Sequence, residues 1–467
     1  MLVCVCVCVR ERERESKFPS KLPFFSYSKT KIKQKSTLTF EQTRTHLNRQ
    51  VINVSRESLL VDSANRNNQD LLLMVLTGAY GTYTFEDVNN ALIRAAINGN
   101  AGCVSLLLDW NADCDAEDMD GDTPLMLAAC NNHVEVVQLL LKAGCGVNRV
   151  SDRHRTALHM AAWVGNVQIC RLLLQAGADT LIREMYGDTA LMLAAHRSPD
   201  VAALLAKEGR QAINMKNESG DSALGCATKS GHFQCVQGLV EAGADVNSRN
   251  RHGETALMFA AYEDRPQVAK FLLDNGADPN IPTKSGVVPL HIAVKKNFEE
   301  TCTVLLEGGA NPNYSDKLGQ RALTFAVASG NATIVSKLIR ARACPQYQGP
   351  SLFHRRTVVV SPLYKALLDK RLDIAKILHR AGSCSQSELY QIHQCEDLQS
   401  ELEDTAKGKE VLAFIKEISC TPTSLRLKCL QTVQSLVGRG RMGREKILSL
   451  QLPKPLIAFL LYEDLDK

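Results

Sequence analysis

Gly121-Asp-Thr-Pro-Leu-Met-Leu-Ala-Ala129 is the stretch that decides the fold, because close variants of it recur along the chain. The leucine of an Ala-Leu or Pro-Leu pair returns every 33 residues, at Leu92, Leu125, Leu158, Leu191, Leu224, Leu257, Leu290 and Leu323. A fixed period of this length is typical of a solenoid, in which each repeat buries its apolar face against its neighbours. We therefore predict an array of stacked repeats.

Each repeat is predicted to be a pair of helices. Thr123 lies where the first helix should begin and can cap its free N–H groups, and Pro124 follows at the first helical position, where a missing N–H costs little. The run Val134-Glu-Val-Val-Gln-Leu-Leu-Leu141 should form the second helix, apolar on most of its circumference because neighbours flank it. Gly144 should end that helix with a positive φ, and a short β-hairpin should lead to the next repeat.

A second signature follows the leucines, as in Ala242-Gly-Ala-Asp-Val-Asn247 and Asn275-Gly-Ala-Asp-Pro-Asn280. Together the two motifs resemble the ankyrin repeat. The resemblance implies an all-α fold, an ankyrin-repeat solenoid of about nine or ten helix-turn-helix repeats over residues 55–383. It also implies that His159 and His291 are structural histidines that hydrogen-bond the backbone and bind no metal.

One step of the array is longer than the others. After Leu323 the next equivalent leucine, Leu363, comes 40 residues later. The extra residues lie near positions 346–357 and are expected to form a loop on the surface, since insertions in solenoids map to loops.

Partner-binding residues are expected on the concave surface that such arrays present. Side chains directly after each Ala-Ala pair, and those in the connecting loops, should face it. Tryptophan, tyrosine and arginine contribute most to binding energy at interfaces. The expected substrate-binding residues are Trp163, His196 and Tyr262 after the Ala-Ala pairs, with Arg183, Tyr186 and Arg251 in the loops. A solvated face without a partner is the alternative interpretation for any one of them.

The C-terminal part carries a second pair of motifs. Leu425, Cys429 and Val433 are spaced to share one face of a helix, and Leu452-Pro-Lys-Pro455 follows. Ser-Leu-x-x-x-Cys-x-x-x-Val followed by Leu-Pro-x-Pro resembles the SOCS box, a small helical domain. The chain as a whole is thus similar to the ankyrin repeat and SOCS box proteins.

The SOCS-box resemblance implies two sets of partners. Leu425, Cys429 and Val433 would bind the elongin B and elongin C pair, whereas Leu452, Pro453 and Pro455 would bind a cullin of the fifth class with its RING partner. The array would recruit an unknown protein substrate. The resemblance therefore implies a substrate-recognition adaptor of a cullin-RING ubiquitin ligase, which promotes ubiquitination and proteasomal degradation.

Two features of this region leave alternatives open. Leu430 replaces an arginine that is common in the family, and Lys454 replaces a residue that is often apolar. The C-terminal region could instead cap the solenoid, since terminal units need a polar outer face. The chain would then be a plain ankyrin scaffold without a ubiquitin ligase.

The remaining segments complete the predicted domain organisation. Residues 1–54 form a low-complexity N-terminus that we expect to be disordered, residues 384–419 a connecting helical segment and residues 420–467 the SOCS box. The alternating Cys-Val and Arg-Glu pairs of residues 1–16 raise the hypothesis that this stretch is not genuine coding sequence.

Composition favours an intracellular protein whose partners are proteins. Sixteen cysteines are scattered through apolar stretches, as small buried hydrophobes are in a reducing compartment, so we expect the cytoplasm, with the nucleus also compatible. A net charge of +5, from 55 basic and 50 acidic residues, gives no reason to expect nucleic acid or membrane partners.

No enzyme active site and no cofactor is predicted. Gly438-Arg-Gly-Arg-Met-Gly443 fits a glycine-rich pattern, but Arg444 and Glu445 replace the Lys and Ser/Thr that a phosphate-binding loop needs. Cys384, His393 and Cys395 match no zinc-binding spacing.

Overall fold

The structure is a computed structural model that describes residues 56–78, 83–346, 349–353, 356–383, 392, 394, 396–403 and 405–420. Its helices follow one another in pairs, two to a repeat. The first five pairs are α3 (Arg56–Asn65) and α4 (Gln69–Leu76), α5 (Phe85–Asn98) and α6 (Ala101–Asp109), α7 (Pro124–Cys130) and α8 (Val134–Lys142), α9 (Ala157–Val164) and α10 (Val167–Gln175), and α11 (Ala190–Arg197) and α12 (Pro199–Glu208).

Five further pairs continue the array, after a short 3₁₀ turn, η2 (Arg210–Ala212). They are α13 (Ala223–Ser230) and α14 (Phe233–Glu241), α15 (Ala256–Tyr262) and α16 (Pro266–Asp274), α17 (Pro289–Lys296) and α18 (Glu299–Glu307), α19 (Ala322–Ser329) and α20 (Ala332–Arg340), and α21 (Pro362–Leu368) and α22 (Leu372–Arg380). The described residues thus contain ten helix pairs, in agreement with the predicted nine or ten.

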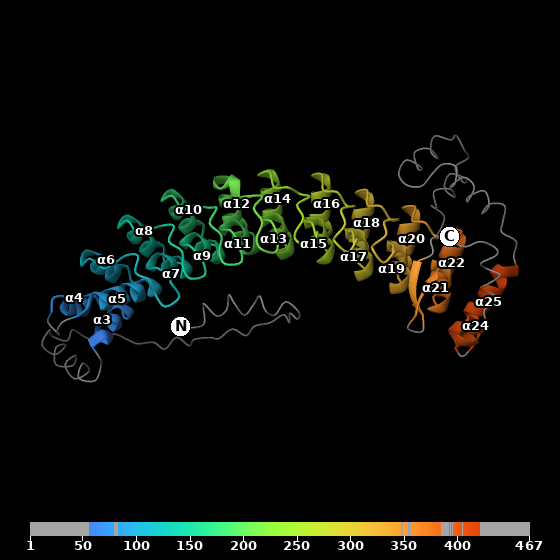
Figure 1. Ribbon diagram of the computed structural model, residues 1–467, viewed down its shortest axis with the longest axis horizontal. Coiled ribbons are helices and arrows are strands. Elements are labelled where there is room, and N and C mark those ends of the chain that lie inside the picture. The colour runs from blue at the N-terminus through green and yellow to red at the C-terminus, as the bar shows by residue number, and fades with distance from the viewer. Residues whose placement is uncertain are drawn as a thin grey trace, which may run out of the picture. The chain divides into compact units, whose positions relative to one another are not determined.

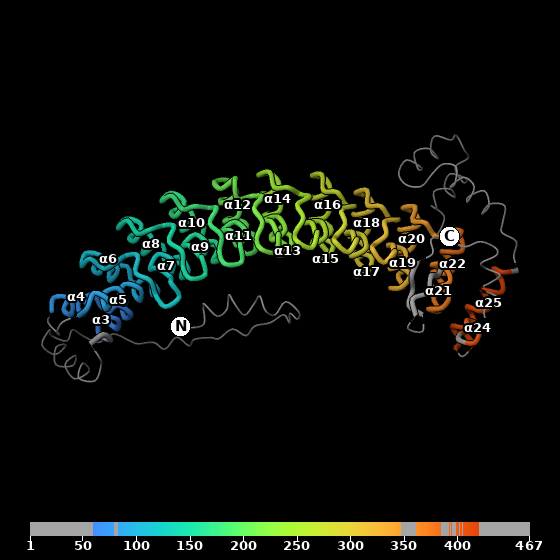
Figure 2. Tube along the Cα trace, viewed as in Figure 1, coloured from blue at the N-terminus to red at the C-terminus, as the bar shows by residue number. Residues whose placement is uncertain are grey.

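The helices lie in two rows. The odd-numbered helices from α3 to α21 each contact the next odd-numbered helix and form the inner row, whereas the even-numbered helices from α4 to α22 form the outer row (Figure 1). The Cα trace repeats the same path in every unit (Figure 2). Because each repeat contacts mainly its two neighbours, the array is the predicted solenoid.

The recurring motif explains why the inner helices can pack closely. The Thr123 hydroxyl accepts a hydrogen bond from the Met126 N–H at 3.4 Å and Pro124 opens α7, as predicted. The alanines Ala128 and Ala129 that follow are completely buried, because neighbouring inner helices approach them from both sides. Leu125 packs with them in one continuous apolar core. Thr255, at the same position in a later repeat, makes no cap hydrogen bond.

The connections between repeats correct one prediction. They are turns and not β-hairpins, and among the described residues of these connections only two isolated antiparallel bridges occur, Arg183 with Thr189 and Ser315 with Arg321. In one connection the Glu184 N–H donates to the Asp188 carbonyl at 2.9 Å and closes the turn, and the pairing beside it ends after the single bridge of Arg183 with Thr189. Instead, each turn bonds to the next, as where Met185 N–H donates to the Arg153 carbonyl at 3.0 Å.

The insertion also differs from the expected loop. It forms an antiparallel hairpin of β1 (Gly349–Phe353) and β2 (Arg356–Val360), with Gly349 opposite Val360 and Phe353 opposite Arg356. The β-branched run Thr357-Val-Val-Val360 explains the strand, because such residues pack well on a pleated surface.

Two further helices follow the array, α24 (Glu396–Glu403) and α25 (Ala406–Cys420). Helix α25 contacts α22, where the rings of His379 and Phe414 lie edge to face with centroids 6.1 Å apart. Val411 and Ile415 of α25 are buried. The last pair of the array is therefore covered on its outer row by an additional helix.

Candidate protein-binding surface

The inner surface is the side of the array made by the carboxyl ends of the inner-row helices and by the connecting turns. Trp163, His196 and Tyr262 lie at or near the last residues of α9, α11 and α15, at equivalent positions of their repeats. Because these inner helices stack through α13, the structure places the three side chains along one line. Arg183, Tyr186 and Arg251 lie in the connecting turns, as expected.

Trp163 and His196 each contact the next repeat. The Arg197 guanidinium lies 4.1 Å from the centre of the Trp163 ring, and Nδ1 of His196 lies 2.7 Å from the Ser230 hydroxyl. The contact with Arg197 was not predicted from the sequence. A cation over an indole face stabilises both side chains, so Trp163 is held in place before any partner arrives.

Tyr262 is held in a similar way from the following repeat. The Lys296 ammonium lies 5.2 Å from the centre of the Tyr262 ring and donates a hydrogen bond to the Tyr262 carbonyl at 3.0 Å. Tyr262 as a whole is 38% exposed, and partial burial raises the pKa of its hydroxyl. Tyr262 therefore presents a fixed aromatic face, which is the arrangement that interface anchors need.

Between these two aromatic residues lies Lys229, whose ammonium group contacts other side chains of the array. The Lys229 ammonium forms an ion pair with Asp221 at 2.7 Å and lies 4.4 Å from the centre of the Phe259 ring. Its charge is thus partly neutralised. The inner surface at this point offers the aliphatic stem of lysine more than its charge.

The turns add apolar side chains that sequence analysis missed. Met119 is fully exposed and Leu318 is 72% exposed, whereas the predicted Tyr186 is 36% exposed beside Met185 at 48%. The repeat could have revealed them: Met119 is equivalent to Met185, and Leu318 to Tyr186. Apolar tips in several turns extend the predicted binding surface along the array.

Charge is distributed unevenly over the turns. Glu117, Asp118 and Asp120 surround the turn before α7, whereas exposed Arg251, Lys284 and Lys317 lie in the turns before α15, α17 and α19. Burial, with Asp118 nearby, raises the pKa of Asp122 to about 6. A partner with the opposite arrangement of charge would be oriented along the array by these turns.

The predicted backbone hydrogen bonds of two histidines are confirmed. Nδ1 of buried His159 accepts a hydrogen bond from the Thr156 N–H at 3.2 Å, and Nε2 of His291 lies 3.0 Å from the Tyr314 carbonyl. Both therefore bond to the backbone of the array.

Several predictions lie outside the described residues. They are the elongin-binding Leu425, Cys429 and Val433, the cullin-binding Leu452, Pro453 and Pro455, the N-terminal residues 1–54, and Cys384, His393 and Cys395. Within the part of the chain that the structure describes, no helix is both long and apolar enough to cross a membrane.

Comparisons with known proteins give one family. The sequence matches the family described as ankyrin repeats (3 copies) over residues 59–151, 143–217, 209–283, 275–348 and 290–388. It is 44% identical to cortactin-binding protein 2 of Rattus norvegicus over 72 residues, which are 15% of this chain and only 4% of that protein. The crystal structure of the ankyrin repeat domain of Bcl-3, a member of the IkappaB protein family, aligns at 26% identity and a TM-score of 0.43, covering 47% of this chain and 99% of that one.

The family match extends from residue 59 to residue 388, well over half of the 467 residues. It covers the helix pairs described above and the residues of the inner surface. This chain belongs to the ankyrin-repeat family.

Proposed function

We propose that this chain is a substrate-recognition adaptor of a cullin-RING ubiquitin ligase. As an ankyrin-repeat protein, the chain is a scaffold for protein–protein interaction. We further propose which partners its two regions bind. The array would hold the target protein on its inner surface, and residues 420–467 would act as a SOCS box, joined to the array by residues 384–419.

The target-binding half rests on the inner surface. Trp163 beneath Arg197 and Tyr262 beside Lys296 are aromatic side chains fixed by a neighbouring repeat. Because their conformations are already restricted, a partner would lose less side-chain entropy on binding them. His196, Arg183, Tyr186 and Arg251 would extend the contact.

The ligase-binding half rests on one sequence observation, the order Ser-Leu-x-x-x-Cys-x-x-x-Val then Leu-Pro-x-Pro. Leu425, Cys429 and Val433 would enter the elongin B and elongin C pair. Leu452, Pro453 and Pro455 would contact a cullin of the fifth class with its RING partner. We expect these encounters in the cytoplasm, and the nucleus is also compatible.

The chain would act by bringing the substrate close to the ubiquitin carrier, and it would not itself be an enzyme. Holding a substrate lysine near a ubiquitin carrier raises its effective concentration, so transfer becomes an intramolecular event within the assembly. No reactive residue of this chain is needed. The rate would depend on how long the substrate stays bound to the inner surface.

Copurification of elongin B and elongin C with the full chain tests the proposal. A Leu425→Asp, Cys429→Asp variant places charge on the predicted binding face, whereas Gln431→Asp adds a charge off that face of the same predicted helix and is the matched control. The proposal expects both elongins with wild type and with the Gln431 variant, and neither with the double variant. Elongins absent from all three chains, each folded by circular dichroism, would refute it.

A plain ankyrin scaffold is the second candidate, and the packing of α25 favours it. Phe414 contacts His379 of the last helix pair, and Val411 and Ile415 are buried, which supports a capping role for residues after the last repeat. In that case the target would be tethered without ubiquitin. Retention of the target without elongins would identify this second function.

A further inference from the structure

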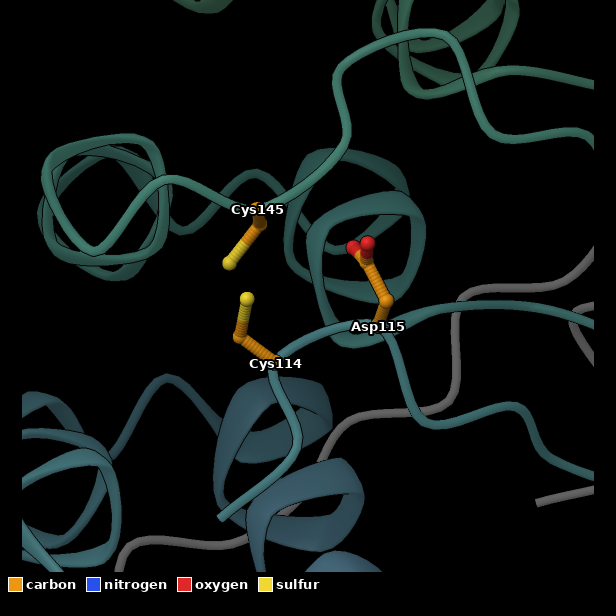
Figure 3. A group of neighbouring side chains, drawn as sticks. All are labelled: Cys114, Asp115 and Cys145. Carbon is orange, nitrogen blue, oxygen red and sulfur yellow. The ribbon is translucent and has the colours of Figure 1, made fainter. Parts of the chain in front are cut away.

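Among the described residues, one group of side chains brings three metal-ligand atoms together. The sulfur atoms of Cys114 and Cys145 and a carboxylate oxygen of Asp115 lie within 4.8 Å of one another. Cys114 and Asp115 follow α6, and Cys145 follows α8, so the group joins two consecutive repeats. Figure 3 shows the two sulfur atoms directed at one another, with the Asp115 carboxylate to one side.

This interface departs from the rest of the array at all three positions. At the 33-residue period, Cys114 is equivalent to Val147, Thr180, Ile213, Val246, Pro279 and Pro312. Cys145 is equivalent to Ala178, Gln211, Ala244, Ala277, Ala310 and Ala343, and Asp115 to Asn148, Leu181, Asn214, Asn247, Asn280 and Asn313. None of these equivalent residues is a cysteine or carries a carboxylate, so the packing between repeats requires neither. The changes at this one interface all introduce side chains that bind metal ions.

We propose that Cys114, Asp115 and Cys145 form a binding site for Zn²⁺ that links the two repeats. Zinc takes cysteine sulfur and carboxylate oxygen in a tetrahedral arrangement, with sulfur atoms roughly 3.8 Å apart when each is about 2.3 Å from the ion. The present separations need only a small contraction. Three protein ligands leave the fourth position for water or for a side chain of a partner.

The position of each group allows a metal ion to enter. Cys145 is buried, whereas Cys114 and Asp115 are partly exposed and would admit the ion from solvent. Oδ1 of Asp115 accepts a hydrogen bond from the Gly146 N–H at 2.8 Å, which fixes the carboxylate beside the sulfur atoms. Arg149 Nε lies 3.9 Å from Oδ2, and its half-exposed side chain can withdraw.

The charge of the site does not oppose binding. Both cysteines are free thiols, and zinc binding would release one proton from each to solvent while forming two Zn–S bonds and one Zn–O bond. The dication replaces two protons, so the net charge is unchanged.

Zinc binding to the full-length chain tests the site. The reduced, metal-stripped protein is titrated with Zn²⁺ against a chromophoric chelator, and the unfolding temperature is measured with and without Zn²⁺. Cys114→Val with Cys145→Ala restores the residues that the array uses elsewhere, so this double variant should fold. Cys170→Ala, which removes a buried thiol outside the group, is the matched control.

Wild type and the Cys170 variant should each bind one more equivalent of Zn²⁺ than the double variant, and only they should melt at higher temperature when zinc is added. Asp115→Asn should weaken binding by about tenfold or more. Charge-transfer absorption from sulfur to bound Co²⁺ should vanish in the double variant. Equal zinc content and equal melting in all four chains would overturn the site, as would a Cys114–Cys145 disulfide under oxidant with no response to zinc.

Discussion

Asn247 bonds directly to Asp278 in the next repeat: its side-chain Oδ1 accepts a hydrogen bond from the Asp278 N–H at 2.8 Å. Its Nδ2 also donates to the Gly276 carbonyl at 3.1 Å. The same pair of bonds recurs at Asn148, Asn214, Asn280 and Asn313. In these five repeats one asparagine thus satisfies two backbone groups of the next repeat, and this explains why the Ala-Gly-Ala-Asp-x-Asn signature ends in that residue.

Asn247→Ala should destabilise the array by about 1–2 kcal/mol, because it leaves a backbone donor and a backbone acceptor of the next repeat without their partner. Chemical denaturation followed by circular dichroism measures the change. Asn275→Ala is the control, since the Asn275 amide bonds only to the Phe271 carbonyl of its own helix, and should change stability by less than about 0.5 kcal/mol. Equal effects of the two substitutions would contradict the inter-repeat role.

Two glycines with similar backbone angles should respond differently to alanine. Gly276 has φ of +87° with no atom near a new Cβ, so Gly276→Ala should cost about 1 kcal/mol through backbone strain alone. Gly220 has φ of +80°, but a Cβ there would lie 2.6 Å from the backbone nitrogen of Arg251. Gly220→Ala should therefore cost about 2–4 kcal/mol, by disturbing the bond that joins two turns. The denaturation midpoints of the two variants measure these losses of stability. A larger loss in Gly276→Ala than in Gly220→Ala would contradict the contact between the two turns.

Buried His159 should make the array sensitive to acid. Burial lowers the pKa of His159 to about 4, so the unfolded chain binds a proton between pH 6.5 and pH 4 and the folded chain does not. The contribution of His159 to the free energy of unfolding should therefore be complete above pH 6.5. It should fall by about 3 kcal/mol as the pH decreases to 4, and change little below pH 4.

His159→Gln keeps a hydrogen-bonding side chain near Thr156 but removes the titrating ring. Its unfolding free energy, measured from pH 7 to pH 4, should fall less steeply than that of wild type. The raised pKa of Asp122 acts in the opposite direction and is present in both chains, so it cancels in the comparison. Parallel curves for the two proteins would disprove the assignment.

The sequence predicted the repeat and much of its local chemistry because these depend on residue type at a fixed spacing. Thr123 and Pro124 start a helix wherever they occur before an apolar run, and Leu125 must then be buried. The tertiary contacts of the inner surface could not be predicted in the same way. Whether Arg197 covers Trp163 depends on the rotation between repeats, which no single residue determines.

Two further features were missed for related reasons. The hairpin of β1 and β2 arises from the β-branched residues 357–360 inside an otherwise helical pattern, where the 33-residue period gives no guidance. The contact of Cys114 with Cys145 depends on residues 31 positions apart in two different repeats. Aligning the repeats by their leucines would have shown both cysteines at positions where the following repeats hold no cysteine.

We propose that the inner surface holds a protein partner. Proximity labelling with the full chain tests it most directly, beside a Trp163→Ala, Tyr262→Ala variant and a Trp110→Ala control, whose tryptophan is 39% exposed at the end of outer-row α6. The account predicts partner proteins labelled by wild type and by the Trp110 variant but lost from the double variant, which should bind at least about tenfold more weakly. The same set of labelled proteins with all three chains would contradict it.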